Sequence, residues 1–204
     1  MDINTKNTHN LDIDTLSLKA KNSIMLMTIE RIKHIFLKKY DVSTLYRAVD
    51  RMLDDFWKWN TSKHLIQGKF IYYTLSNQKI ESQYLGVEFL YYNHKIDLMT
   101  ILDGYESLGD DATVLSFGVD YCLSRMEIYD RLFLQKEISL PSEIYEVNSD
   151  EFFATLNYAI EIIENPIKEQ EWQRKALGKL LKNHSVAKVG EWGEPIEKSF
   201  FDDI

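Results

Sequence analysis

The chain has 204 residues, of which 45% are hydrophobic and 27% charged, and its formal net charge at pH 7 is -8. This is ordinary globular composition, long enough for one well-buried core, and the acidic balance argues against nucleic-acid binding. A single cysteine excludes an intramolecular disulfide framework, and no run of about 18 apolar residues occurs, so we expect a cytoplasmic protein that does not span a membrane.

The first part of the chain predicts an arm followed by a helix. Residues 1–12 are polar and lack the basic and apolar regions of a signal peptide, so we expect a flexible arm. From Leu16 to Tyr40, apolar residues recur at helical spacing, and most charged residues fall outside their stripe. The stripe contains Met25, Ile29, Ile32 and Phe36, and the charged residues outside it are Lys19, Glu30, Arg31, Lys33 and Lys38.

A second helix is predicted after Ser43, which has the side chain of a helix N-cap. The short connection to the first helix indicates an antiparallel helical hairpin. The helix ends in the sequence FWKW. Trp57 follows the apolar stripe and is expected in the core, whereas Trp59 is turned by about 200° at 100° per residue. We therefore expect Trp59 either to pack on a following segment or to lie at the surface.

The next two segments are harder to assign. Residues 65–75 are rich in β-branched and aromatic side chains, which suits a strand, but no partner strand of similar character follows closely. We therefore predict a helix there. Residues 84–102 show helical periodicity, with Leu85, Phe89 and Tyr92 on the apolar face, and predict a further helix.

Two loops and three helices are predicted in the second half. A loop at 103–109 precedes a helix whose first turn holds Asp110 and Asp111, and a second loop runs from Pro141 to about residue 149. The helix after the first loop places Leu115, Val119, Cys122, Met126 and Tyr129 on one face. The helix after the second loop places Phe153, Leu156, Ile160 and Ile163 on one face. The last helix, 168–183, brings Trp172, Ala176 and Leu180 together.

These elements together predict an all-α fold, a single-domain antiparallel helical bundle of about six to seven helices. The bundle is expected to span residues 13–184, followed by an irregular C-terminal tail at 185–204 that contains two glycines and a proline. Cys122 is expected to be a buried, inert thiol because it lies on an apolar helix face.

Acidic residues are concentrated in two segments. Residues 96–124 and 137–167 contain no Lys or Arg and together hold 13 of the 32 acidic residues, so the rest of the chain has 19 acidic against 24 basic residues. Such a distribution creates a negative field that steers a basic partner. The basic residues of the last helix are interpreted as a solvated face, or as one that neutralises the acidic segments internally.

The sequence contains no catalytic, cofactor or metal motif. No two of the five histidines lie three or four residues apart, so a helical metal site has no support, and the acidic residues of 103–111 do not follow the calcium-loop pattern. We therefore expect a binding protein without enzymatic activity, cofactor or metal. The alternatives are an enzyme whose site assembles from scattered residues, such as His34, His64 and acidic residues of the later helices, or a helical scaffold that self-associates.

The Trp-bearing second helix ending in FWKW and the acidic Gly109-Asp110-Asp111-Ala112 that opens a later helix resemble the all-α immunity proteins of bacterial polymorphic-toxin (contact-dependent inhibition type) systems. The resemblance implies a helical bundle that binds and neutralises a cognate toxin. It also implies that this toxin is a basic protein and that the acidic loops of the bundle contact it. Tyrosines in the same loops are expected to anchor the partner. The predicted partner-binding residues are Asp103, Tyr105, Glu106, Asp110, Asp111, Glu143, Tyr145 and Glu146.

Overall fold

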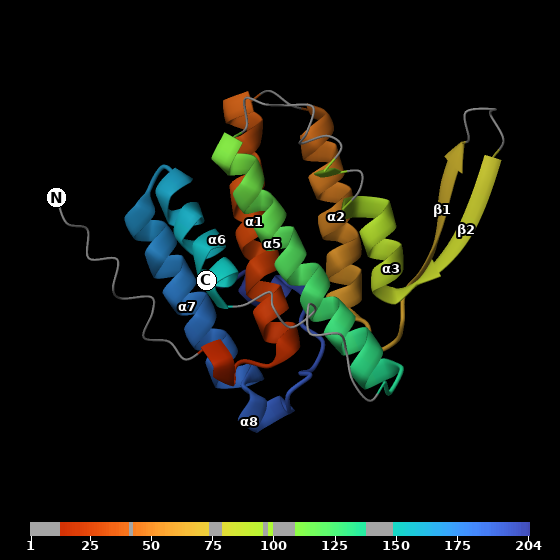
Figure 1. Cartoon of the computed structure of the whole chain (residues 1–204). Helices are drawn as coiled ribbons and strands as arrows, with labels where there is room; N and C mark the ends of the chain where they lie inside the picture. The colour runs from red at the N-terminus through yellow and green to blue at the C-terminus, as the bar shows by residue number, and fades with distance from the viewer. Residues whose placement is uncertain (1–12, 41–42, 74–78, 96–97, 100–108, 138–148) are drawn as a thin grey trace.

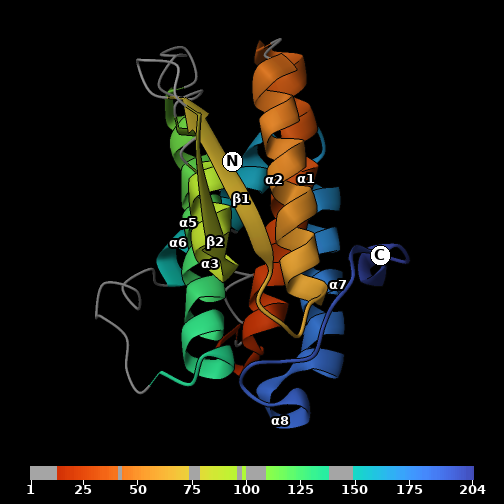
Figure 2. The ribbon, with the colours of Figure 1, turned by 90° about the vertical axis from the view of Figure 1, so that its right-hand side faces the viewer.

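Helix α1 (Leu18–Tyr40) is the central element of the structure (Figure 1). It packs against α2 (Ser43–Thr61), α5 (Gly109–Ile128), α6 (Ser149–Ile162) and α7 (Pro166–His184). Viewed from the side, α1, α2 and α7 form one layer, and α3, α5 and α6 form a second (Figure 2). A single cluster of buried apolar side chains lies between the two layers.

The computed structural model describes residues 13–40, 43–73, 79–95, 98–99, 109–137 and 149–204. Within these residues the predicted all-α, single-domain bundle is confirmed, with one β-hairpin added to it. The predicted N-terminal arm, residues 1–12, lies outside the described residues.

Helix α1 is buried on more sides than its sequence predicts, because neighbouring helices cover several of its faces. Consecutive residues from Ile24 to Leu26 are fully buried. Lys19, Glu30 and Lys33, which the periodicity places outside the apolar stripe, are buried as well. They are tolerated there because each is paired: the Lys33 ammonium, for example, lies 2.7 Å from Glu30 Oε2 and 2.6 Å from Asp50 Oδ1.

Both tryptophans of the FWKW sequence are buried, on different sides of α2. Trp57 contacts Phe201 of the C-terminal segment, with ring centroids 6.4 Å apart, and Trp59 contacts Tyr129, with centroids 5.3 Å apart. Trp59 is the more deeply buried of the two, at 2% exposure against 8% for Trp57. Of the two alternatives for Trp59, packing on a later segment is the one observed.

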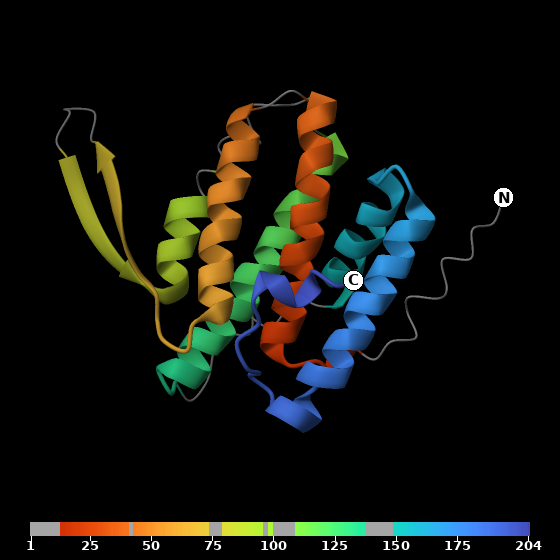
Figure 3. The ribbon, with the colours of Figure 1, turned by 180° about the vertical axis from the view of Figure 1, so that it is seen from behind.

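The prediction of a helix over 65–75 is wrong. Strand β1 (Gln67–Tyr73) pairs antiparallel with β2 (Lys79–Leu85), with Gln67 opposite Leu85 and Tyr73 opposite Lys79. The partner strand (KIESQYL) has four polar residues among its seven, Lys79 and the run Glu81–Gln83, so its character differs from that of β1. The hairpin projects from the bundle, and β2 is the strand farther from it (Figures 1 and 3).

The single helix predicted over 84–102 is also wrong in its first part. Residues 84–85 end β2, and helix α3 (Gly86–Leu90) follows directly and continues into a π-helical turn, η3 (Tyr91–Lys95). A second π-helical turn, η5 (Tyr129–Leu134), extends α5. π-Helical turns are rare in proteins, and those that occur are often found at functional sites.

The later helices follow their predicted apolar faces with one shift. On α5, Leu115, Val119 and Cys122 are buried as predicted, and on α7 Trp172, Ala176 and Leu180 are buried together. On α6 the fully buried face contains Phe152, Leu156 and Ala159, so it is turned by about one residue from the predicted stripe. Pro166 begins α7, and the side chain of Asn165 caps it by accepting from the Lys168 N–H at 3.1 Å.

The C-terminal segment contains two short helical turns, α8 (Val186–Val189) and η7 (Lys198–Phe201), and packs across α1 (Figure 3). Ile196 and Phe201 are buried in the core. The amide of Asn60 donates to the Ile196 carbonyl at 2.9 Å, which joins this segment to the end of α2. Near the start of α1, a 3₁₀ turn, η2 (Ile13–Thr15), precedes an isolated bridge between Leu16 and Ser185.

Candidate functional site

The predicted acidic site lies beyond what the structure describes. Asp103, Tyr105, Glu106, Glu143, Tyr145 and Glu146 are outside the described residues. Asp110 and Asp111 belong to the first turn of α5, as predicted, but their side chains are not among those described. The acidic partner site therefore stays a prediction.

Two acidic residues of the base-free segments are neutralised by neighbouring cations. Asp120 on α5 forms an ion pair with Lys95 of η3. Glu137 lies 2.8 Å from the Arg131 guanidinium, which also contacts Glu127 at 3.1 Å. The cations lie just outside the base-free segments in sequence, not on the first or last helix. At these positions the negative charge available to a partner is reduced.

A group of exposed aromatic and apolar side chains lies where the hairpin meets the bundle. We call Tyr84, Leu85, Tyr91 and Tyr92 the tyrosine patch. Leu85, Tyr91 and Tyr92 are 49%, 44% and 37% exposed. The rings of Tyr84 and Tyr92 stack at 4.6 Å with an interplanar angle of 26°, and Tyr91 meets Tyr92 edge-on at 5.6 Å. These contacts fix large amphipathic rings at the surface of the molecule.

Lys95 connects the tyrosine patch to the acidic segment of α5. Its ammonium lies 5.9 Å from the centroid of the Tyr91 ring and is ion-paired with Asp120. The patch therefore borders on helix α5, whose first turn contains Asp110 and Asp111. The tyrosines of η3 and the acidic residue Asp120 of α5 thus belong to two elements that contact each other through Lys95.

A buried polar centre holds the base of the hairpin to the bundle. Lys19, at 0% exposure, donates to the carbonyls of Asn60 (2.9 Å) and Ser62, at the C-terminal end of α2. Its ammonium also lies 5.0 Å from the Trp59 ring and 4.8 Å from the Tyr129 ring. Burial lowers the pKa of Lys19 to about 8, while the nearby Asp130 carboxylate favours the charged form.

Asp130 of η5 is the acidic member of this centre and is fully buried. Its carboxylate accepts from the Trp59 indole N–H and from the Val87 backbone N–H, both at 2.9 Å. Burial raises the pKa of Asp130 to about 6, although these two hydrogen bonds favour the ionised form. Asp130 therefore fixes the start of α3 against the end of α2.

Gly86 is required for this close approach. Its φ is +57°, in the region that residues with a Cβ rarely adopt. A Cβ built there would lie 2.9 Å from Leu65 Cδ2 and in direct conflict with Asp130 Oδ2. The turn from strand β2 into α3 thus depends on glycine at this position.

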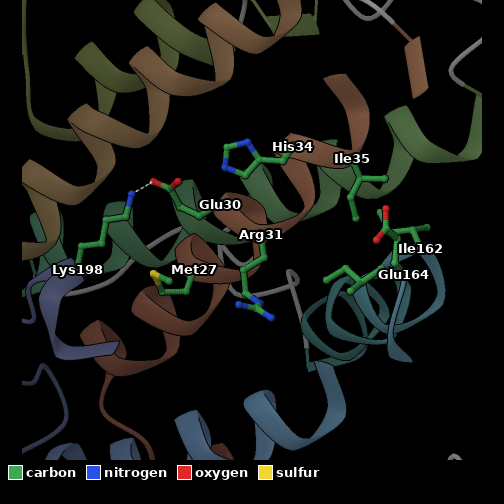
Figure 4. Close-up of a pocket in the computed structure, with 9 residues that line it drawn as sticks. Met27, Glu30, Arg31, His34, Ile35, Ile162, Glu164 and Lys198 are labelled. Atoms are coloured by element: carbon green, nitrogen blue, oxygen red, sulfur yellow. Dashed lines mark hydrogen bonds and ion pairs between the residues drawn. The ribbon is translucent and has the colours of Figure 1, made fainter. Parts of the chain in front are cut away.

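A pocket of about 520 Å³ lies beside α1, between the end of α6 and the C-terminal segment (Figure 4). It is lined by Met27, Glu30, Arg31, His34, Ile35, Ile162, Ile163, Glu164 and Lys198. Apolar side chains from α1 and α6 supply much of its wall, and charged groups of both signs surround them. The size is within the range of ligand sites in proteins.

The main charges of this pocket are already paired. The guanidinium of Arg31 binds the fully buried Glu169 carboxylate through Nε at 2.8 Å and a terminal nitrogen at 2.5 Å, and lies 4.2 Å from the Trp172 ring. The Oε1 atom of Glu30 lies 2.7 Å from the Lys198 ammonium, and its Oε2 atom forms an ion pair with Lys33. The charged groups of Arg31 and Glu30 are therefore already engaged by other residues of the bundle.

The structure does not bring together the two histidines named for the enzymatic alternative. His34 lines the α1 pocket and contacts Tyr46 near the start of α2 at 5.9 Å, whereas His64 follows the end of α2. About 22 Å of helix separate Tyr46 from Thr61, at 1.5 Å per residue.

Among the described residues, His94 of η3 does meet a carboxylate: its Nε2 lies 2.9 Å from Asp55 Oδ2. His94 is buried and does not line the α1 pocket. In the part of the chain that the structure describes, no three His, Cys, Asp or Glu side chains gather closely enough to hold a metal ion.

Comparison with known proteins finds no matching family, no similar curated protein and no similar solved structure. Within the described residues, no helix combines the length and apolar character needed to cross a membrane.

The sequence reasoning missed the tyrosine patch because it placed Leu85 and Tyr92 on the buried face of one long helix. Both residues are exposed, since that helix is interrupted by the end of β2 and by the π-helical turn. One signal was available in the sequence. Tyr91 and Tyr92 are adjacent, and because two successive residues of a helix are turned by about 100° from each other, they do not lie on the same line of the buried face.

Proposed function

We propose that this chain is a non-enzymatic binding protein that neutralises a basic protein partner by occlusion, in the manner of the immunity proteins that its sequence resembles. The observation that supports this function best is the tyrosine patch. Three of its members, Leu85, Tyr91 and Tyr92, are more than a third exposed, although each is a large side chain with much apolar surface. Tyrosine is enriched at protein interfaces because its ring contributes buried apolar area and its hydroxyl a hydrogen bond.

In this proposal the patch and the acidic residues have different tasks. Stacked rings on a folded scaffold lose little conformational entropy on binding, so the patch supplies affinity. The acidic residues of segment 96–124 attract the partner over a distance and raise the association rate. The contacts of Lys95 with Tyr91 and with Asp120 of α5 support this division, since they join the patch to the helix that Asp110 and Asp111 begin.

The function is tested with the polypeptide encoded by the gene adjacent to this one. We expect that polypeptide to bind the chain and to inhibit growth when produced alone, and the chain to restore growth. The double variant Tyr91→Ala/Tyr92→Ala should weaken binding at least tenfold, which corresponds to about 1.4 kcal/mol. The matched control is Ile167→Ala on α7, a more exposed apolar residue away from the patch, which should leave affinity within about twofold.

The steering role is tested separately. Replacement of Asp103, Glu106, Asp110 and Asp111 by Asn or Gln should lower the association rate and reduce its dependence on ionic strength, with a small effect on dissociation. An adjacent gene product that neither binds nor inhibits growth contradicts the proposed function. Unchanged binding by the Tyr91→Ala/Tyr92→Ala variant contradicts the role of the patch.

A further inference from the structure

We propose that two copies of this chain associate by pairing their β2 strands edge to edge, with a two-fold axis at Ser82. The two hairpins then form one four-stranded antiparallel sheet. This inference does not rest on the proposed function, because it concerns the backbone edge of β2; Tyr84 and Leu85 belong to both β2 and the tyrosine patch.

The edge of β2 is open to a second molecule. In the described part of the chain the sheet has only β1 and β2, so each strand has one edge without a partner strand. Over the part of the hairpin that projects from the bundle, β1 lies on the side of the bundle and β2 on the outer side, and both strands meet α3 at the base (Figures 1 and 3). In that projecting part the edge of β2 faces away from the described helices.

A strand edge of this length favours pairing. Strand β2 has seven residues, Lys79–Leu85, and its outer backbone groups can form a second ladder of hydrogen bonds. A two-stranded hairpin that projects into water is marginally stable, and sheets of three or more strands are stable on their own. When an identical strand is added, the outward N–H and C=O groups of β2 in both molecules form hydrogen bonds with each other.

The sequence of β2 is compatible with pairing against itself. In a two-fold antiparallel register centred on Ser82, all seven residues find partners. In this register position 80 is opposite position 84 of the second copy, position 81 is opposite position 83 and Lys79 is opposite Leu85. The sequence therefore places no two like charges at opposed positions of the register. Because both copies use the same strand edge, the contact is complete in a dimer and leaves no such edge of β2 for a third copy.

Net charge does not prevent the contact. The chain carries -8 overall, but the stretch from Gln67 to Leu85 contains Lys69, Lys79 and Glu81 as its charged residues. The hairpin is thus slightly basic, whereas the negative charge is concentrated in segments 96–124 and 137–167. At physiological ionic strength, charges farther apart than about 8 Å are largely screened.

Cysteine cross-linking tests the register directly. Opposed residues of an antiparallel pair have Cα atoms about 4.5–5.5 Å apart, within the range that a disulfide bridges. We expect Ser82→Cys to form a covalent dimer on mild oxidation, because the two sulfurs meet at the axis. In the matched control, Lys79→Cys, the two cysteines are about 20 Å apart along the strands and should not react with each other. The native Cys122 is buried and does not compete.

The mass in solution provides the second readout. Sedimentation equilibrium of the unmodified chain should show a concentration-dependent shift from the 24.1 kDa monomer to the dimer. Ser82→Lys places two like charges on the axis and should abolish the dimer, with an unchanged circular dichroism spectrum. A monomer at every concentration up to the solubility limit overturns the proposal. A dimer that cross-links equally at positions 79 and 82, or that persists in Ser82→Lys, overturns it as well.

Discussion

The indole N–H of Trp59 donates to the carboxylate of Asp130 at 2.9 Å, which joins the end of α2 to η5 across 71 residues of sequence. The other oxygen of the same carboxylate accepts the Val87 N–H at the start of α3. Because the tyrosine patch lies immediately before and after α3, one buried carboxylate determines how the patch is held against the bundle.

Asp130 should make the protein less stable as the pH rises through the acid range. Its pKa is about 6 in the folded protein against a usual 3.8, so between these values the folded state binds more protons than the unfolded state. The contribution of Asp130 is most favourable below pH 3.8 and falls as the pH rises to 6, by roughly 3 kcal/mol at 1.36 kcal/mol per pKa unit. Urea unfolding of the unmodified chain and of Asp130→Asn, each at pH 4.5 and 7, isolates this contribution.

The difference between the two proteins is the relevant quantity, since other groups also titrate. We expect the free energy of unfolding of Asp130→Asn, relative to the unmodified chain, to be higher at pH 7 than at pH 4.5. An equal difference at both pH values would show that the carboxyl titrates normally in the folded state.

Lys19→Met should destabilise the protein at pH 7 by about 3–5 kcal/mol, because the carbonyls of Asn60 and Ser62 lose their donor and Asp130 remains buried without its cation. The pKa of Lys19 is lowered to about 8, so in the unmodified chain its contribution to stability increases between pH 8 and 10.5. Chemical unfolding at pH 7 and 10 measures both effects. A variant as stable as the unmodified chain at pH 7 would contradict this role of Lys19.

Gly86→Ala should be strongly destabilising, by about 1–3 kcal/mol or more, since it combines a positive φ with overlap on the Asp130 carboxylate. Gly178→Ala is the matched control: Gly178 lies in the middle of α7 and an added Cβ would meet no atom within 4 Å. That substitution should stabilise by about 0.5–1 kcal/mol through helix propensity. Thermal unfolding of both variants tests the contrast, and a Gly86→Ala protein that melts like the Gly178→Ala protein refutes it.

Arg31→Met should cost about 3–5 kcal/mol of stability, because Glu169 is fully buried and would lose its cation. Adding Glu169→Gln should recover part of the loss, as a double-mutant cycle would reveal. The exposed pair of Lys175 and Glu171 on α7 serves as the comparison, and Lys175→Met should cost less than about 0.5 kcal/mol. Equal losses for Arg31→Met and Lys175→Met would mean that burial does not distinguish the two pairs.

Cys122 should not react with a thiol reagent while the protein is folded. Burial raises the pKa of its thiol well above the usual value, so the reactive thiolate is scarce and shielded. Labelling with a disulfide reagent should proceed in urea and be negligible in buffer. Rapid labelling in buffer would contradict the buried position.

Regular periodicity was sufficient to predict the helices that bury one face. The spacing of Leu115, Val119 and Cys122, and that of Trp172 and Ala176, reports a single apolar stripe, and both stripes face the core. Helix α1 is different because several helices cover it. A charged residue such as Lys19 then becomes interior, and the partners that make this possible come from distant parts of the sequence.

The hairpin and the tyrosine patch, by contrast, could not be predicted from residue spacing. Strand β2 is rich in polar residues, as suits a strand that is not enclosed by the core, so its pattern does not identify it as the partner of β1. Without β2, residue spacing places Leu85 and Tyr92 on one buried helix face. The stacking of Tyr84 on Tyr92 depends on a strand and a π-helical turn meeting in space, which residue spacing does not encode.

Photo-cross-linking is the most direct test of the claim that the tyrosine patch binds the partner. A photoreactive phenylalanine analogue is placed at position 91 or, as the control, at position 167, and each protein is irradiated with the polypeptide encoded by the adjacent gene. We predict a covalent adduct from position 91 and none from position 167. Adducts from position 167 alone, or equal yields from both positions, would contradict the account.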